Sequence, residues 1–390
     1  MLWLTLTRYR AVGLAVAAFV WALPVLAQHA TPGSEPRNSY SASAQNSSGP
    51  LPVFEFHSGF WTNLHHFLYQ QGRLRQASES GAGKSSPASQ NAGEPVRTEA
   101  LSREEQTAWG GAVEYYRKNL SGKDLLFNGE MVAYKNRLAE LENCGDFSGR
   151  SGAACDAGLP AELTRALEAA APVYRAHWWT EHDRANRAWI AMVTPLVSKM
   201  GGDLARDLAE VYQARWPAGK IRVDVTIYAN WAGAYTTLEP VDVTLSSSDP
   251  RNQGASGFEI LFHEASHALA EGVSNAIIRE CRSRGKPIPR DLWHALLFYT
   301  TGRLVQRAFG AGGALAGSAG DPAAKTSAAG DSSSNSGGKA AASYTPYAIR
   351  EGLYTRGWSG YLHLLERFWQ PYLDGKIDFD TAIARMVSSL

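Results

Sequence analysis

The sequence of 390 residues has few cysteines, almost no net charge and, beyond its N-terminal segment, no long apolar run. Three cysteines exclude a scaffold built from disulfides and a zinc module built from paired Cys-x-x-Cys hooks. The 38 basic and 37 acidic residues give a formal charge of +1, which argues against non-specific nucleic-acid binding, because such binding needs clustered Lys and Arg. Hydrophobic residues make up 44% of the chain and charged residues 19%, so a large core can form and wholesale disorder is excluded.

The N-terminal segment has the features of an export signal. Arg8 and Arg10 form a short basic region, residues 11–23 are apolar and uncharged, and Val25-Leu26-Ala27 has the small residues of a cleavage site. The uncharged run is about 13 residues long, whereas a membrane-spanning helix needs roughly 20. We therefore expect residues 1–27 to be a signal peptide rather than an anchor. The mature protein would be periplasmic or secreted, with no membrane association once the signal is removed.

An exported protein enters an oxidising compartment, where its cysteines can form disulfides. Cys144 and Cys155 flank a loop rich in Gly, Ser and Asp, which can close without strain, and an oxidising compartment favours the bond. We predict a disulfide between Cys144 and Cys155, with Cys281 left as a free thiol. The alternative is that all three cysteines are unpaired.

The apolar pattern predicts an α+β fold that is predominantly helical, with a small β-hairpin or sheet in the second half of the chain. Residues 221–229 and 234–246 alternate β-branched and polar side chains, which predicts a hairpin joined by residues 230–233. Helical spacing is expected over residues 60–74, 101–120, 126–143, 160–175, 178–199, 201–215, 256–271, 273–283, 290–309, 348–373 and 378–389.

The domain organisation follows from composition. Residues 28–51 are rich in Ser, Pro, Gly and Asn and are expected to be a flexible lead-in. Residues 52–390 are expected to form one mostly helical domain. Two low-complexity insertions, at 76–96 and 310–342, interrupt this domain rather than divide it, because neither flanking piece resembles a self-sufficient domain.

One segment carries recognisable chemistry, the His-Glu-x-x-His sequence at residues 263–267. His263 and His267 are four residues apart on an expected helix, so both imidazoles lie on one face and can bind the same metal ion. Zn²⁺ suits such nitrogen ligands in a site that keeps one position open. Glu264 would lie near that position and could act as general base. The alternative is a helix whose two histidines merely form hydrogen bonds in the core.

This segment, preceded by a predicted hairpin and followed by a second helix, resembles the zincin metallopeptidases over residues 260–270. The resemblance implies a zincin-like catalytic core, Zn²⁺ as cofactor and hydrolysis of a peptide or protein substrate. It also implies an antiparallel edge strand that binds extended substrate and a third zinc ligand downstream. The third ligand of the metzincins is missing, since Ala270, Glu271, Gly272 and Asn275 follow the motif. The glutamate-containing stretch of the thermolysin-like enzymes is also missing.

We assign the third ligand to His294. It lies one turn into an expected helix that is apolar on most sides, where a buried imidazole needs a partner for its nitrogens. The alternatives are a core role for His294, or one of three carboxylates as the ligand. Glu271 lies on the zinc helix itself, Glu280 lies in a basic run, and Asp291 has the position of a helix N-cap.

Further site residues are less strongly marked. Tyr228, Tyr299 and Tyr344 are candidate hydrogen-bond donors to a transition state, a role that zincins often give to Tyr or His. Glu259 lies one turn before His263 and either holds an imidazole or is structural. The histidines at 57, 65, 66, 177 and 182 are interpreted as core or surface residues.

Three functions remain open at this stage. The first is an exported zinc metallopeptidase with Glu264 as general base. The second is a zinc amidase or other zinc hydrolase that acts on a non-peptide substrate of the cell envelope. The third is a non-enzymatic envelope protein with a residual zinc site. The sequence leaves the oligomeric state open.

Overall fold

The computed structural model describes residues 53–79, 96–147, 155–311 and 344–390. The predicted signal peptide, the lead-in and most of both insertions lie outside the described residues. The described residues belong to one unit, which extends from Gly49 to Leu390. Among them, no helix is long and apolar enough to cross a membrane.

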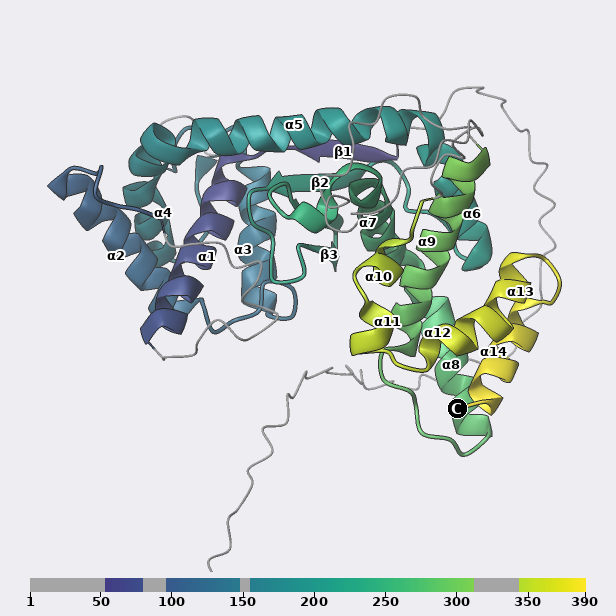
Figure 1. The fold of residues 1–390 in the computed structure, drawn as a ribbon. Coiled ribbons are helices and arrows are strands. Elements are labelled where there is room, and N and C mark those ends of the chain that lie inside the picture. The colour runs from purple at the N-terminus through teal and green to yellow at the C-terminus, as the bar shows by residue number, and fades with distance from the viewer. Residues whose placement is uncertain (1–52, 80–95, 148–154, 312–343) are drawn as a thin grey trace, which may run out of the picture. The chain divides into compact units, whose positions relative to one another are not determined.

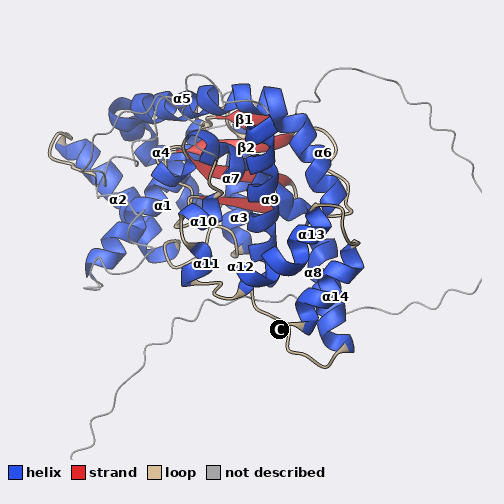
Figure 2. Ribbon diagram, turned by 45° about the vertical axis from the view of Figure 1, so that its right-hand side comes forward, coloured by secondary structure: helices blue, strands red, loops and turns tan. Residues whose placement is uncertain are grey.

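A four-stranded sheet lies between two groups of helices (Figures 1 and 2). The strands are β1 (Phe54–His57), β2 (Ile221–Thr226), β3 (Ala234–Leu238) and β4 (Val241–Ser246), in the order β1-β2-β4-β3. β2 pairs in parallel with β1 and β4, and β3 pairs antiparallel with β4. β3 therefore forms one edge of the sheet.

The predicted hairpin between residues 221–229 and 234–246 is wrong. The second stretch contains both β3 and β4, and the turn between them is at Glu239-Pro240. A proline within a strand pattern indicates such a turn, because it has no N–H for the ladder. β1 was not predicted, because four residues are too few to show an alternating pattern.

The two faces of the sheet pack against different groups of helices. On one face, Val223 and Leu245 pack in a core cluster with Phe258 and Phe262 of helix α7 (Gly254–Ser266). The opposite face carries polar side chains that are nevertheless buried, because the N-terminal helices cover them. Lys135 is fully buried there, and its ammonium group donates to the Asp242 carboxylate at 2.8 Å. Burial on both faces leaves the sheet rigidly held under α7.

The N-terminal helices form a second core cluster against the polar face. They are α1 (Phe60–Glu79), α2 (Arg103–Asn119), α3 (Gly129–Glu140) and α4 (Ala161–Tyr174). Helices predicted separately at 160–175, 178–199 and 201–215 form one continuous run. Two π-helical turns, η3 (Arg175–Trp179) and η4 (Val197–Gly201), join α4 to α5 (Thr180–Leu196) and α5 to α6 (Gly202–Val211). The glycines at 201 and 202 therefore do not end a helix.

The C-terminal helices lie on the other side of the sheet in Figure 1. Helix α8 (Ala270–Ser283) and helix α9 (Leu292–Ala311) are followed by shorter pieces. The single helix predicted over 348–373 is wrong, since Gly352 and Gly360 adopt positive φ and break it. This stretch instead forms α10 (Tyr347–Arg350), α11 (Leu353–Arg356), α12 (Tyr361–Leu364), the π-helical turn η8 (Leu365–Trp369) and α13 (Gln370–Leu373). The helix predicted at 378–389 is α14 (Phe379–Ser388).

The predicted disulfide is confirmed. Cys144 and Cys155 are bonded, with their Cα atoms 5.6 Å apart, and the Trp61 indole donates to the Cys144 carbonyl at 2.7 Å. Closing a loop of this length stabilises the folded chain by about 3 kcal/mol in the chain-entropy account. Cys281 is a free, buried thiol.

Candidate metal centre

Helix α7 carries the His-Glu-x-x-His sequence and is buried on all sides from Ser256 to Ser266. The sheet lies on one side of it, and α5, α9 and α10 cover the others. Close packing at its first turn requires a glycine, because a Cβ on Gly257 would collide with the carbonyl oxygen of Asn252.

The helix type changes at the second histidine of the motif. α7 ends at Ser266, residues His267–Leu269 form a 3-10 turn, and α8 begins directly at Ala270. The boundary predicted between the helices at 256–271 and 273–283 is therefore wrong, since Gly272 lies within α8. The boundary between the two helices lies instead at the 3-10 turn that begins with His267.

The structure brings His294 to the two histidines of the motif. His294 lies in the first turn of α9, and its Nε2 is 3.2 Å from Nε2 of His263. One nitrogen of each of His263, His267 and His294 lies within 4.8 Å of the others. The three histidines are therefore close enough to hold a metal ion.

Aromatic side chains pack against two of the three imidazoles, those of His263 and His294. The ring of Phe298, one turn after His294 on α9, stacks on His263 with centroids 3.5 Å apart. Trp293 stacks on His294 at 5.1 Å, and Trp358 approaches the edge of His294 at 5.4 Å. Sequence reasoning missed these contacts. Phe298 and Trp293 share a helix with His294, so spacing could have identified them, but nothing local marks Trp358.

All three imidazoles are electrically neutral at neutral pH. Burial lowers the pKa of His267 to about 4 and that of His294 to about 3, the latter also because of the neighbouring His267. Burial, together with the other two histidines, holds the pKa of His263 well below its ordinary value. Neutral imidazoles have free lone pairs, which is the state that a metal ion needs.

Glu264 lies beside this group. Its side chain is 10% exposed, and one carboxylate oxygen is 3.9 Å from Nε2 of His267. The same oxygen accepts a hydrogen bond from the hydroxyl of Thr236 on β3 at 2.8 Å, which fixes its direction. Burial raises the pKa of Glu264 to about 7, and the Thr236 hydroxyl opposes that rise. Thr236 was not predicted, since nothing in the sequence relates β3 to α7.

Three imidazole nitrogens are a donor set that suits a metal ion such as Zn²⁺. Two nitrogens that each bind zinc at 2.0–2.1 Å lie about 3.3 Å apart in a tetrahedron, close to the separation of the Nε2 atoms of His263 and His294. One feature departs from the usual pattern, in which the second nitrogen of a ligand donates to a partner. Nδ1 of His263 is buried and has no hydrogen-bond partner among the described residues, so the stacked Phe298 ring orients this imidazole instead.

The three candidate tyrosines have other partners or neighbours. The Tyr344 hydroxyl donates to the carboxylate of Glu259 at 2.7 Å, and that of Tyr299 donates to Gln370 at 2.8 Å. Tyr228 packs with the N-terminal helices, in the other core cluster from the histidines. Glu259 also accepts the backbone N–H of Tyr347 at 2.9 Å. Glu259 thus bonds the segment at Tyr344–Tyr347 to helix α7.

The buried Glu259 leads to a prediction about pH and stability. Burial raises the pKa of Glu259 from its ordinary 4.5 to about 7, so as the pH rises the unfolded state loses its proton before the folded state does. Its stabilising contribution is complete below about pH 4.5 and is lost as the pH rises through about 7. Glu259→Gln cannot ionise. Its unfolding free energy should therefore gain about 2–3 kcal/mol relative to the wild type between pH 4.5 and pH 8.

Urea unfolding of the metal-free proteins at several pH values measures this difference. Glu104→Gln is the matched control, because Glu104 is exposed on α2 and forms no ion pair with a described residue. The difference in unfolding free energy between the wild type and Glu104→Gln should stay constant with pH. If the difference in unfolding free energy between the wild type and Glu259→Gln were equally constant, Glu259 would ionise in the folded protein as it does in water.

The carboxylates considered as rival ligands lie elsewhere. Glu280 pairs with Arg284, rather than with Arg279 or Arg282, and Asp291 lies 3.6 Å from Arg290. Glu271 lines a groove beside His267, but the group of potential ligands in the described residues contains only the three histidines.

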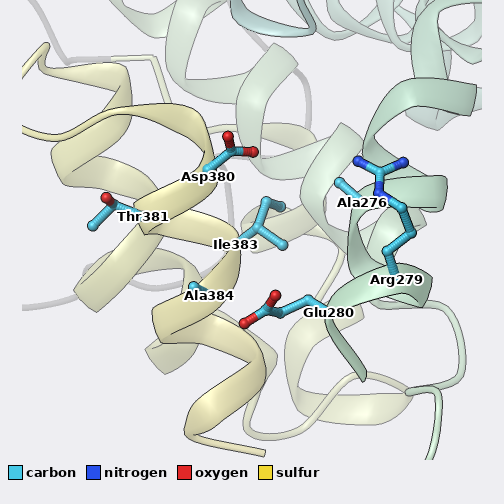
Figure 3. A pocket seen from close by; sticks show the side chains of 7 residues that line it. All are labelled: Ala276, Arg279, Glu280, Asp380, Thr381, Ile383 and Ala384. Atoms are coloured by element: carbon cyan, nitrogen blue, oxygen red, sulfur yellow. The ribbon is translucent and has the colours of Figure 1, made fainter. Parts of the chain in front are cut away.

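A separate hollow of about 360 Å³ lies between α8 and α14 (Figure 3). Its charged residues are of both signs, Arg279, Glu280 and Asp380, and no histidine or cysteine lines it. The one group of potential metal ligands among the described residues lies elsewhere, at the three histidines, so we do not assign the reaction to this hollow.

The chain gave no match to a known protein family, to a curated protein or to a solved structure. Functional inference therefore depends on the geometry of the site and on the resemblance of residues 260–270 to the zincins.

Proposed function

We propose that this protein is a zinc-dependent hydrolase, and specifically a metallopeptidase. The observation that carries the proposal is the convergence of His263, His267 and His294 beside the buried carboxylate of Glu264. A bound zinc ion would supply Lewis acidity, which polarises a substrate carbonyl and lowers the pKa of water. An exported location, periplasmic or secreted, is part of the proposal and rests on the predicted signal peptide.

The residues of the chain have complementary roles in this reaction. Glu264, held by Thr236, takes a proton from the attacking water and passes it to the leaving nitrogen, as the water oxygen bonds to the carbonyl carbon and the C–N bond breaks. β3 is an edge strand, antiparallel to β4, and Thr236 joins it to Glu264. An extended peptide can pair with such an edge, which supports a peptide over a smaller amide as substrate.

Metal removal tests the proposal. The purified protein should contain one zinc ion per chain by elemental analysis and should cleave members of a peptide library detected by mass spectrometry. A chelator should abolish cleavage, and added Zn²⁺ should restore it, whereas added Mg²⁺ should not. A folded protein that binds no zinc, or cleavage that survives complete metal removal, would contradict the proposal.

A further inference from the structure

A groove of about 420 Å³ lies directly beside His267. It is bounded by the end of β3 and the turn into β4, by the 3-10 turn after α7, by α8 and by the start of α9. Its lining residues are Leu238, Glu239, Val241, His267, Ala268, Ala270, Glu271, Ser274 and Trp293. An occupant of this groove would therefore lie against the candidate metal centre and against the edge strand at once.

The groove has negative charge and no positive charge. Glu239 and Glu271 are its only acidic residues, and no Lys or Arg lines it. Both glutamates are exposed, and neither forms an ion pair within the described parts of the chain. Two carboxylates without an ion-pair partner among the described residues give the groove a field that attracts a cation.

The remaining lining is apolar. Leu238, at the end of the edge strand, is 54% exposed and gives the groove an accessible aliphatic surface. Trp293, at the start of α9, adds an aromatic side chain to the lining. A long aliphatic stem can lie over Leu238 and Trp293 while a cationic tip reaches the carboxylates, which is the shape of Lys and Arg.

We propose that this groove binds a Lys or Arg side chain of the polypeptide substrate, at a position close to the bond that is cleaved. The proposal rests on the metallopeptidase function, and it names Glu239 and Glu271 as the residues that determine specificity. Because both carboxylates are exposed to solvent, each contributes modestly, and their attraction weakens as salt is added.

Matched peptides test the charge requirement directly. Peptides that carry Lys or Arg near the cleaved bond are compared with peptides that carry norleucine or citrulline, which keep the stem without the charge. We expect kcat/KM to favour the basic residue by about 10-fold, and each of Glu239→Gln and Glu271→Gln to reduce that preference by about 3-fold. The double variant should show almost no preference, and so should Glu271→Lys, because either change leaves the groove without net charge. Glu104→Gln removes the same charge on α2 and should leave the preference unchanged.

A binding measurement separates the failure of this proposal from the failure of the proposed function. Fluorescence anisotropy of labelled peptides is measured on the zinc-loaded Glu264→Gln protein. Cleavage without a basic preference, or a preference that persists in the double variant, would overturn the groove assignment and leave the peptidase intact. No cleavage of any peptide, together with tighter binding of Lys than norleucine peptides that depends on Glu239 and Glu271, would overturn the peptidase and support the groove.

Discussion

Glu264→Gln is expected to lower kcat for peptide hydrolysis by about 10³-fold while the protein keeps its zinc and its fold. The substitution preserves the shape of the side chain and the acceptor oxygen for Thr236, but an amide cannot take a proton from water. General base catalysis contributes roughly 10²–10⁴-fold in enzymes, which sets the size of the loss. KM should change little, because the carboxylate acts on the water rather than on the resting substrate.

The control for this prediction is Glu259→Gln, which makes the same substitution at a buried glutamate of the same helix. Glu259 contacts Tyr344 and the backbone of Tyr347 rather than the histidines, so its activity should stay within a few fold of wild type. Zinc content and near-ultraviolet circular dichroism are measured for both variants. Undiminished turnover by Glu264→Gln would show that another group takes the proton, and loss of zinc would show that Glu264 acts on the metal site itself.

The parts of the site that could be predicted are those set by local spacing. His263 and His267 follow from the helical period, and His294 follows because a buried imidazole in an apolar helix needs a partner. The structure places all three together. Each inference needed only the residue types and the helix on which they lie.

The parts that could not be predicted depend on which distant segments pack together. The parallel pairing of β2 with β4 and the bond from Thr236 to Glu264 leave no trace in a local pattern. Trp358 reaches His294 from a segment that was predicted to be one helix and is broken at Gly352 and Gly360. The helices from α4 to α6 show the opposite error, a predicted boundary that does not exist. Two glycines there are typical of a helix end, but they lie inside a continuous helical run that contains two π-helical turns.

His294→Phe is expected to weaken zinc binding by at least about 100-fold while the protein still folds. Phenylalanine keeps an aromatic ring between Trp293 and Trp358 but offers no nitrogen, so the packing survives and the ligand is lost. Removing a partner that only orients a ligand already costs about 10–100-fold in metal affinity, so the loss of a ligand itself should cost at least as much. Zinc affinity is measured by competition with a chelator of known affinity.

The melting temperature provides an independent readout of the same loss. Zinc that binds only the folded protein stabilises it by about 4 kcal/mol at a free concentration of 1,000 Kd, so the wild type should melt at a distinctly higher temperature with zinc than without it. His294→Phe should show little of this rise at the same zinc concentration. His363→Ala, which removes an exposed histidine of α12, should show the full rise. If His294→Phe bound zinc as tightly as the wild type, the third ligand would be another group, and the closeness of His294 to His263 would be a packing contact alone.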